Sequence, residues 1–557
     1  MFCFNLDPQT TYALIIAIPV VWAFRIYTEY KALTQQDGIR QILGPVTLFA
    51  AYSMPAFTFH NSSRIALGYF QFWLSRRDWY ENAKSDIVYA VSLLPRVKLT
   101  LLVADPSVAK QITSSRIHFP KPVEKYGLLT VFGSNIVASE GNLWKKYRRI
   151  CAPSFSERNN RLVWDTTMRA INGFFESEDW KQSLRNSGKV VIQDLRVHTA
   201  DWTLRVIAAA GFGQDLSTQT FSQADGNSSL PTAKDAFEIV SKDIMLYLLL
   251  PKWFLNHSDQ FTWGRVKTKL SGVRRAFTNL QDYLLGIINE RRSDGDSTVE
   301  GPDSEMSTNH DLFTNLLRAN DAEHEETEAD DDSKPTLRLD DSELIGNIFV
   351  FLLAGHETTA HTLCFALHLL ALYPEEQRKL YDDIRVVCNG RIPDDGCSPG
   401  ILEALSTRTN VPKTSHDNTS IVVHGPKGVQ DLVVPVPQGT QVMLHIAGLH
   451  YNPKYWPNPT EFKPDRFMPG PGGDPTWPKD AFIPFSAGSR SCIGRRFAET
   501  ESVAIITTIV LMYEITVKED AQFRGETFEE KRRRVLKVLN GPTIKPGAVP
   551  LVFRKRD

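Results

Sequence analysis

The spacing of hydrophobic and polar residues along the chain predicts mostly helices. From residue 160 to residue 292 the apolar side chains recur at helical intervals, as in the segment Phe277–Arg292. Residues 340–343, Asp-Asp-Ser-Glu, have the composition of a capping box and precede a long apolar segment that ends near Ala371, before Pro374. At about 1.5 Å per residue, the helix that begins at this capping box would be roughly 45 Å long and would cross the whole molecule.

Shorter segments that are rich in branched residues predict a smaller β-rich part. Ile87–Leu94 and Val97–Val103 are separated by a proline turn, which predicts two neighbouring strands. Asp105 and Pro106 then have the composition of a helix start, with an N-cap and a proline in the first helical position. We therefore expect a mainly α fold with a smaller β-rich subdomain. Further strands and a strand-rich tail are predicted at residues 421–423, 432–434, 441–444 and 515–553.

The N-terminal 85 residues have a different pattern. Residues 11–24 are apolar and uncharged, and basic residues follow them. We interpret residues 1–30 as a membrane anchor whose basic flank stays in the cytosol, with a peripheral hairpin as the alternative. Residues 31–85 are expected to be a membrane-proximal linker, whose apolar stretch Leu43–Phe59 contains two prolines and would lie against the bilayer.

Composition argues against several classes of protein but does not identify the function. The chain has 557 residues and a net charge of −1, which argues against a general nucleic-acid binder. Its six cysteines show no paired C-x-x-C spacing, so a zinc knuckle or a disulfide framework is not expected. Residues 293–335 contain an acidic run and are expected to form a flexible, solvated loop.

The stretch Phe485-Ser-Ala-Gly-Ser-Arg-Ser-Cys-Ile-Gly494 carries the clearest chemistry in the sequence. A thiolate can bind iron, and Cys492 precedes a segment of helical character, where free backbone N–H groups favour an anion. Gly488 and Gly494 allow close approaches that a Cβ would block, and Phe485 can pack beside the sulfur. Arg490 supplies a forked cation suited to a carboxylate. The alternative is a small buried core cysteine.

This loop resembles the haem-binding loop of the cytochrome P-450 family, the haem-thiolate monooxygenases. The resemblance covers most of the chain and implies the cytochrome P-450 fold, with the long helix crossing the haem. It implies that Cys492 is the axial ligand of the iron of haem b, where the thiolate promotes O–O cleavage. The expected cofactor-binding residues of the loop are Cys492, Phe485, Gly488, Arg490 and Gly494.

Two further motifs resemble the same family. In the middle of the long helix lies Ala354-Gly-His-Glu-Thr-Thr, where Gly355 would leave room for dioxygen and Thr358 would offer it a hydroxyl group. Glu357 would take part in a proton relay through water. The alternative role for Thr358 is a hydrogen bond to the preceding turn of its own helix.

The second of these motifs is Trp-Lys-Lys-Tyr-Arg, in which Trp144 and Arg148 share one helical face. By resemblance both would donate to a haem propionate, whereas a surface helix with one buried tryptophan is the alternative. The loop Phe119–Val131 would overlie the haem and help to choose the substrate.

The family resemblance also implies the reaction and its partners. One oxygen atom from O2 would enter an apolar organic substrate, in secondary metabolism or xenobiotic oxidation, and electrons would come from NADPH through a partner reductase. A small electron-transfer haem protein is a further expected partner. The protein would be a single-pass protein of the endoplasmic reticulum membrane with its haem domain in the cytosol. A docking face for the reductase is expected at Lys145, Lys146, Arg149, Arg495 and Arg496.

The sequence departs from the family at one place. The segment Arg391–Pro412 lacks the expected Glu-x-x-Arg, whose pair would hold Arg466 in a structural triad. We therefore expect a haem domain over residues 86–557 with an apparent defect at about 391–412, and Arg466 as an uncompensated buried cation that costs about 3–5 kcal/mol. The alternatives are a non-catalytic haem-binding relic, a defective gene model, or a haem isomerase or dehydratase. Glu357 and Thr358 argue against the isomerase or dehydratase.

Overall fold

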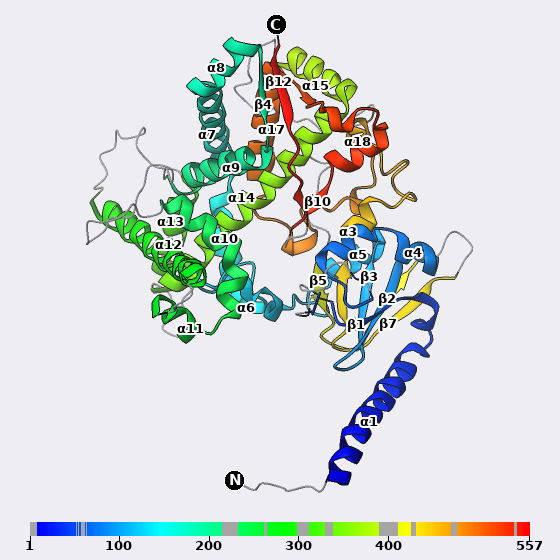
Figure 1. Ribbon diagram of the computed structural model, residues 1–557. Helices are drawn as coiled ribbons and strands as arrows, with labels where there is room; N and C mark the ends of the chain where they lie inside the picture. Colours follow the sequence, from blue (N-terminus) through cyan, green and yellow to red (C-terminus); the bar gives the residue numbers. More distant parts are fainter. Residues whose placement is uncertain are drawn as a thin grey trace. The chain divides into compact units, whose positions relative to one another are not determined.

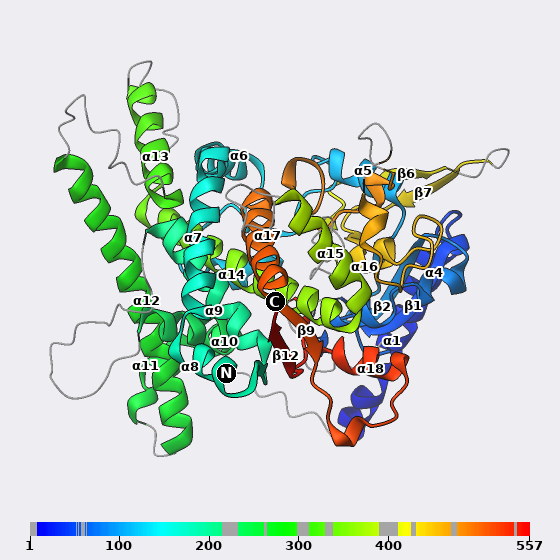
Figure 2. The same ribbon diagram turned by 90° about the horizontal axis from the view of Figure 1, so that it is seen from above.

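The structure is a computed structural model of the chain. It describes residues 8–51, 53, 55–56, 62, 64–213, 232–260, 264–297, 311–328, 338–388, 410–424, 430–468, 470, 476–539 and 543–556. Helices make up most of these residues, and the strands form small sheets, as Figure 1 and Figure 2 show. The predicted fold class, mainly helical with a smaller β-rich part, is confirmed.

The first of two compact units is built on a five-stranded sheet. It comprises the described residues of Met1–Pro122, Ser406–Cys492 and Leu539–Lys545. Strands β2 and β3 form the antiparallel pair that the sequence predicts, and β3 pairs in parallel with β8, which lies far along the chain. The strands in their order across the sheet are β1 (Leu43–Phe49), β2 (Ile87–Leu94), β3 (Lys98–Val103), β8 (Gln441–Leu444) and β5 (Val411–Thr414).

Residues 31–85, expected as a linker, contribute to this unit. Strand β1 pairs in parallel with β2 at the edge of the sheet. The helices α3 (Tyr69–Leu74) and α4 (Asp78–Ala83) carry buried aromatic side chains that pack with β2 and β8 in one cluster. This region differs from the expected membrane-proximal linker in that its aromatic side chains are buried against the sheet.

Other elements of the first unit also begin and end close to the predicted positions. The Asp105 carboxylate accepts a hydrogen bond from the Val108 N–H (2.9 Å) and caps α5, as predicted. The predicted strands near residues 421 and 432 pair antiparallel as β6 and β7. The predicted elements are α5 (Pro106–Ser114), β6 (Thr419–Val423) and β7 (Leu432–Val436). The unit also contains elements for which the sequence made no prediction, α16 (Ile446–His450) and the 3₁₀ helices η1 (Arg40–Ile42), η6 (Pro464–Phe467), η7 (Lys479–Ala481) and η8 (Gly488–Arg490).

The expected anchor lies within helix α1 (Pro8–Thr34). Large apolar side chains on this helix are exposed, among them Val21, Trp22 and Phe24. Near its end, a carboxylate oxygen of Glu29 accepts a hydrogen bond from the Val97 N–H (3.3 Å), which ties α1 to the turn before β3.

The second unit is mostly helical. It comprises the described residues of Val123–Leu405, Ile493–Val538 and Pro546–Asp557. Its helices are α6 (Gly141–Cys151), α7 (Glu157–Phe175), α8 (Glu178–Ser187), α9 (Leu195–Phe212), α10 (Ala233–Leu249), α11 (Lys252–Asn256), α12 (Gly264–Ser297), α13 (Leu312–Glu328), α14 (Asp341–Leu372), α15 (Pro374–Val387), α17 (Arg495–Met512) and α18 (Phe528–Val535), with the 3₁₀ helices η2 (Val123–Thr130), η3 (Ala152–Phe155), η4 (Ser258–Gln260) and η9 (Ala521–Phe523). Its three-stranded sheet has the order β4 (Lys189–Ile192), β12 (Leu551–Lys555) and β9 (Tyr513–Val517). Two further short strands in the chain are β10 (Val538–Leu539) and β11 (Lys545–Pro546).

Helix α14 forms the centre of this unit. The predicted capping box is present, because the Asp340 carboxylate accepts from the Glu343 N–H (2.8 Å) and the Glu343 carboxylate accepts from the Asp340 N–H (3.0 Å). The helix contacts α9, α12, α15 and α17. Within the described part of the chain it is the one helix that is long and apolar enough to cross a membrane, and 61% of its most apolar window is buried inside the protein. It is therefore the core helix of the unit.

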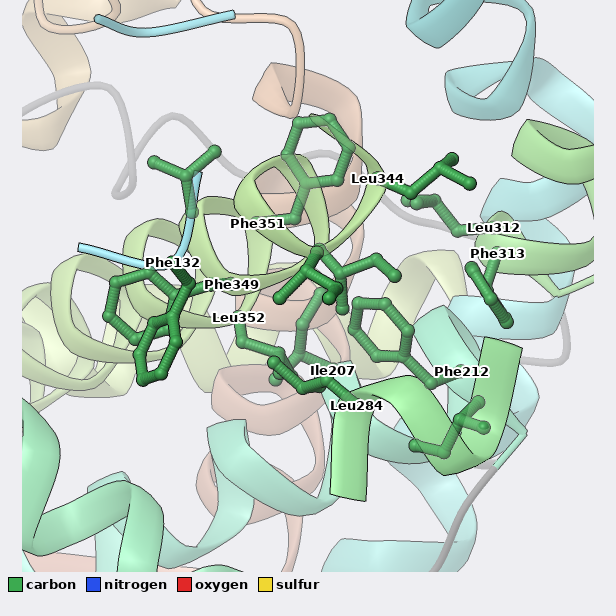
Figure 3. Packing of buried hydrophobic residues seen from close by; sticks show 14 of the residues in the cluster. Phe132, Ile207, Phe212, Leu284, Leu312, Phe313, Leu344, Phe349, Phe351 and Leu352 are labelled. Atoms are coloured by element: carbon green, nitrogen blue, oxygen red, sulfur yellow. The ribbon is translucent and has the colours of Figure 1, made fainter. Parts of the chain in front are cut away.

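The hydrophobic core of the second unit surrounds α14. Figure 3 shows Phe349 and Leu352 of α14 with Ile207 of α9 and Leu284 of α12 in one cluster. Phe132, from the segment before α6, packs its ring edge against Phe349 with centroids 4.7 Å apart. The long helix is thus packed on several sides, as expected for an apolar helix without a polar face.

Two predicted segments differ from the structure. Helix α12 continues to Ser297 and α13 continues to Glu328, so that parts of the expected acidic loop 293–335 are helical, while residues 298–310 and 329–337 lie outside the described residues. The tail predicted to be strand-rich contains helix α18 between strands β9 and β12. Segments rich in Glu, Lys, Arg and Ala form helices readily, which accounts for the second half of α13 and for α18. The composition of residues 293–297, Ser-Asp-Gly-Asp-Ser, does not explain the extension of α12.

Candidate functional site

The cysteine loop ends at the start of a helix, as the sequence predicts. Helix α17 begins at Arg495 with Gly494 as its N-cap residue, two positions after Cys492. The Cys492 N–H donates to the Phe485 carbonyl (2.9 Å), which closes the loop, and the side chain of Cys492 is exposed. The loop therefore presents a thiol rather than burying it.

At one position of the loop, glycine is required for a steric reason. Gly488 has a φ of +71°, and a Cβ at this position would lie 2.6 Å from the carbonyl oxygen of Thr113 at the end of α5. At Gly494 the φ is −88° and a Cβ would make an ordinary contact of 3.6 Å with Phe155. The predicted close approach is thus confirmed at Gly488, whereas a role for Gly494 toward a cofactor stays a prediction.

The other described cysteines differ from Cys492. Burial raises the pKa of the Cys151 thiol to about 12 and raises the pKa of Cys364 further still. Cys388 is half-buried near the end of α15. Cys3 and Cys397 lie outside the described residues. The alternative of a buried core cysteine thus describes Cys151 and Cys364, not Cys492.

Sequence reasoning missed a histidine that supports this loop. The Ile483 N–H donates to Nε2 of His450 (3.0 Å), and the Ile483 carbonyl accepts from the Ser486 N–H (3.0 Å). The His450 ring also packs on Phe482, with centroids 4.8 Å apart. Burial lowers the pKa of His450 to about 3, so the ring is neutral and Nε2 remains an acceptor. The available signal was a histidine within an aromatic-rich segment that precedes the loop.

The polar motif of the long helix interrupts a buried surface. Residues 344–352 and 359–360 of α14 are buried, whereas Ala354 is exposed and Gly355, Glu357 and Thr358 are half-buried. The Thr358 hydroxyl donates to the Ala354 carbonyl (2.6 Å), which is the back-bonding that the sequence leaves open. A Cβ at Gly355 would lie 3.3 Å from the side chain of Ile207, so glycine here also lets α9 pack closely.

The predicted propionate-binding residues lie on helix α6. Trp144 is buried, and Arg148, one turn later on the same face, is half-buried. Within the part of the chain that the structure describes, Arg148 has no ion-pair or hydrogen-bond partner. A half-buried guanidinium of this kind is suited to a carboxylate supplied by a ligand.

Three of the five residues of the expected docking face form ion pairs within the protein. Lys146 forms an ion pair with Glu343 (2.7 Å), and Arg495 and Arg496 both pair with Glu499. Lys145 and Arg149 are exposed on α6. Docking of a reductase at these residues stays a prediction.

The expectation for Arg466 is wrong. Its guanidinium is half-buried, and its nitrogen atoms donate to backbone carbonyls around it, so the cation is compensated within its own segment. The accepting carbonyls belong to Lys463, Pro457, Asn458 and Glu461. The residues 391–409, in which Glu-x-x-Arg is expected, lie outside the described residues.

These observations fit a haem, although each unit supplies its residues separately. The first unit provides an exposed thiol and the loop arginine Arg490, and the second provides Arg148 and the exposed turn at Ala354. A thiolate for iron, cations for propionates and an exposed helix turn beside a hydroxyl are groups that suit such a cofactor.

Comparison with known proteins gives the same assignment. The model of the cytochrome P450 family matches residues 84–397 and 410–537. The chain is 38% identical to cytochrome P450 monooxygenase 124 of Postia placenta over 98% of this chain and 99% of that protein. It is 25% identical to cytochrome P450 monooxygenase prx9 of Penicillium rubens over 80% of this chain and 78% of that protein. Its fold is similar to the crystal structure of the cytochrome P450DA haem domain, with a TM-score of 0.64 and 21% identity over 93% of this chain and 99% of that one.

The family model thus spans most of the chain and includes both the cysteine loop and the long helix, and the Postia placenta relative matches the chain almost from end to end. The exposed thiol of Cys492 is the group that this match would require. The chain belongs to the cytochrome P450 family and is a haem-thiolate monooxygenase.

Proposed function

We propose that this enzyme inserts one oxygen atom of O2 into an apolar organic substrate, with electrons from NADPH that arrive through a partner reductase. The observation that carries the proposal is the exposed Cys492 thiol at the end of a hydrogen-bonded loop, just before α17. The thiolate would hold the iron of haem b, and the cofactor, when bound, supplies the activation of oxygen.

The remaining residues of the proposed site bind and orient the cofactor. Arg490, Trp144 and Arg148 would hold its propionates, and the absence of a partner for Arg148 among the described residues supports this role. Phe485 would pack beside the sulfur, and Gly488 keeps the loop close to α5. Gly494 would let the cofactor approach the start of α17.

The test of the proposal is the spectrum of the ferrous carbon monoxide complex. We expect the red-shifted Soret band of a thiolate ligand in the wild-type protein and its loss in Cys492→Ser. Cys388→Ser removes a half-buried thiol elsewhere and should keep the band. A red-shifted Soret band that persists in Cys492→Ser would contradict the assignment of Cys492 as the iron ligand.

Glu357 and Thr358 are proposed to deliver protons rather than to bind the cofactor. Thr358→Ala should keep the haem but release more hydrogen peroxide for each NADPH consumed, because water would no longer be held beside the oxygen site. Thr362→Ala is the matched control, since the Thr362 hydroxyl also donates one turn back, to the Thr358 carbonyl (2.8 Å). Equal coupling of NADPH to product in the two variants would contradict the role of Thr358.

We also propose a single-pass location in the endoplasmic reticulum membrane, with residues 1–30 as the anchor and the haem domain in the cytosol. The exposed apolar side chains of α1 support it. Protection of the haem domain from protease in intact microsomes would reverse this topology.

A second candidate, a haem-binding relic or a defective gene model, is favoured by one observation. The family match is interrupted at residues 398–409, inside the segment that lacks Glu-x-x-Arg. Sequencing the spliced message tests the gene model directly. A message that encodes these residues, in a protein that turns over substrate, would remove both alternatives.

A further inference from the structure

We propose that Glu343 is a positioning residue that holds helix α6, and with it Trp144 and Arg148, against the first turns of α14. This inference rests on the proposed haem-binding role of α6. Glu343 acts through Lys146 and Tyr147 and does not touch the cofactor itself.

The Glu343 carboxylate is shared between its own helix and α6. One oxygen accepts from the Tyr147 hydroxyl (2.8 Å), and the other accepts from Lys146 Nζ (2.7 Å) and from the Asp340 N–H (3.0 Å). The side chains of Lys146 and Glu343 are only 20% and 13% exposed. Burial alone would raise the pKa of Glu343, but these hydrogen bonds outweigh it and lower the pKa, so the carboxylate stays charged. A capping box alone would need only the contacts within α14.

A second contact between α14 and the α6 region lies one turn further along α14. Asn347 is fully buried, and its side-chain oxygen accepts from the Ile136 N–H (2.9 Å) while its amide donates to the Glu343 carbonyl (2.7 Å). Between these two residues, a Cβ on Gly346 would lie 2.5 Å from the Ser134 carbonyl oxygen, so the two backbones are in direct contact. The segment leading into α6 and α6 itself are therefore fixed to the same two turns of α14.

This arrangement links the two parts of the proposed site in the second unit. Glu343 and Thr358 lie on one continuous helix, and fifteen residues of helix span about 22 Å. Because a helix is stiff over this length, holding α6 at Glu343 also sets where Arg148 lies relative to the turn at Ala354. Lys146 thus has a structural partner on α14.

The test compares haem release from the folded holoenzyme with thermal stability. Glu343→Gln keeps the side-chain size and an acceptor for Tyr147 but loses the charge that binds Lys146. We expect haem transfer to apomyoglobin to become about five- to tenfold faster, the size of the net contribution of one lost hydrogen bond. Asp201→Asn is the matched control, because the Asp201–Lys234 ion pair joins α9 to α10 at similar exposure (23% and 28%) and does not involve α6.

A double-variant cycle then shows whether Glu343 acts through α6. In an Arg148→Ala background, Glu343→Gln should no longer accelerate haem release, although it should lower the melting temperature as before. Equal haem release from Glu343→Gln and Asp201→Asn, or an undiminished effect of Glu343→Gln in the Arg148→Ala background, would overturn this inference alone. A wild-type protein without the thiolate Soret band would overturn the proposed function, and this inference with it.

Discussion

At the scale of single residues, a buried histidine in the first unit connects three segments. His445 follows β8, and its ring lies among Phe72, Trp79 and Tyr80. Its Nε2 lies 2.7 Å from the Phe72 carbonyl oxygen, which can only accept, so Nε2 carries the proton and donates it. Its Nδ1 must then accept from the Tyr80 hydroxyl (2.9 Å). The site is built for a neutral ring, and burial lowers the pKa of His445 to about 4.

We expect this histidine to make the first unit sensitive to acid. The folded-state pKa of about 4 lies below the ordinary value of 6.5, so the unfolded chain binds more protons between these pH values. Stability is therefore complete above pH 6.5 and falls by about 3 kcal/mol as the pH approaches 4. His450, whose pKa burial lowers to about 3, adds to the loss in the same direction.

The measurement is urea unfolding at several pH values between 4 and 7. His445→Gln should flatten the dependence on pH, even though the variant is less stable at neutral pH. A wild-type curve that is flat over this range would contradict the prediction.

Single residues also show what the sequence can reveal of the site. Cys492 and Gly488 were identifiable because their motif is contiguous and its spacing alone implies a tight loop before a helix. The contacts of His450 with Ile483 and of Glu343 with Lys146 join residues far apart in the chain, and one sequence carries no signal of such pairs. The cost assigned to Arg466 was wrong because backbone carbonyls can satisfy a guanidinium without any carboxylate partner.

At the scale of elements, local signals predicted boundaries well where they were strong. Caps and prolines placed the starts of α5 and α14, and branched residues placed β2 and β3. Strand β1 was missed because it lies in the apolar stretch Leu43–Phe59, whose two prolines suggested a membrane contact, and because its partner β2 lies some forty residues later. Pairing partners of this kind depend on the whole fold rather than on the segment.

Two helical glycines should respond in opposite ways to the same substitution. Gly346→Ala places a Cβ 2.5 Å from a backbone oxygen, so we expect a loss of about 1–3 kcal/mol through overpacking. Gly286 lies on an exposed face of α12 with no heavy atom within 4 Å of a Cβ, and Gly286→Ala should stabilise by about 0.5–1 kcal/mol. Thermal unfolding of the two variants checks both signs. Stabilisation by Gly346→Ala would show that the backbone contact at Gly346 is not tight, and destabilisation by Gly286→Ala would contradict the expectation for Gly286.

At the scale of the whole molecule, the chain passes repeatedly between its two units, and one of these passages falls between Cys492 and Ile493. The sequence predicted an anchor, a linker and one haem domain, because composition changes near residue 85. It could not predict this division, since each unit is assembled from stretches that lie far apart in the chain.

The N-terminal helix gives a prediction at this scale. A chain that lacks residues 1–24 keeps Glu29 and its hydrogen bond to Val97, so the sheet should remain intact. We expect this chain to leave the membrane pellet at high salt, whereas the full-length protein should stay. If the shortened chain remains in the pellet, a further change of the exposed Val46 and Leu48 on β1 to Ser will show whether β1 is the membrane contact.

The long-range pairing of β3 with β8 has a consequence for how the protein is made. On the ribosome, β2 and β3 can pair as soon as they emerge, but Thr100 must wait for Gln441, its partner in the sheet. Until then, one edge of a hydrophobic strand is open to pairing with other chains. Every helix from α6 to α15 is synthesised during this wait. The yield of active protein will therefore depend on chaperones and on the speed of translation as much as on the stability of the finished fold.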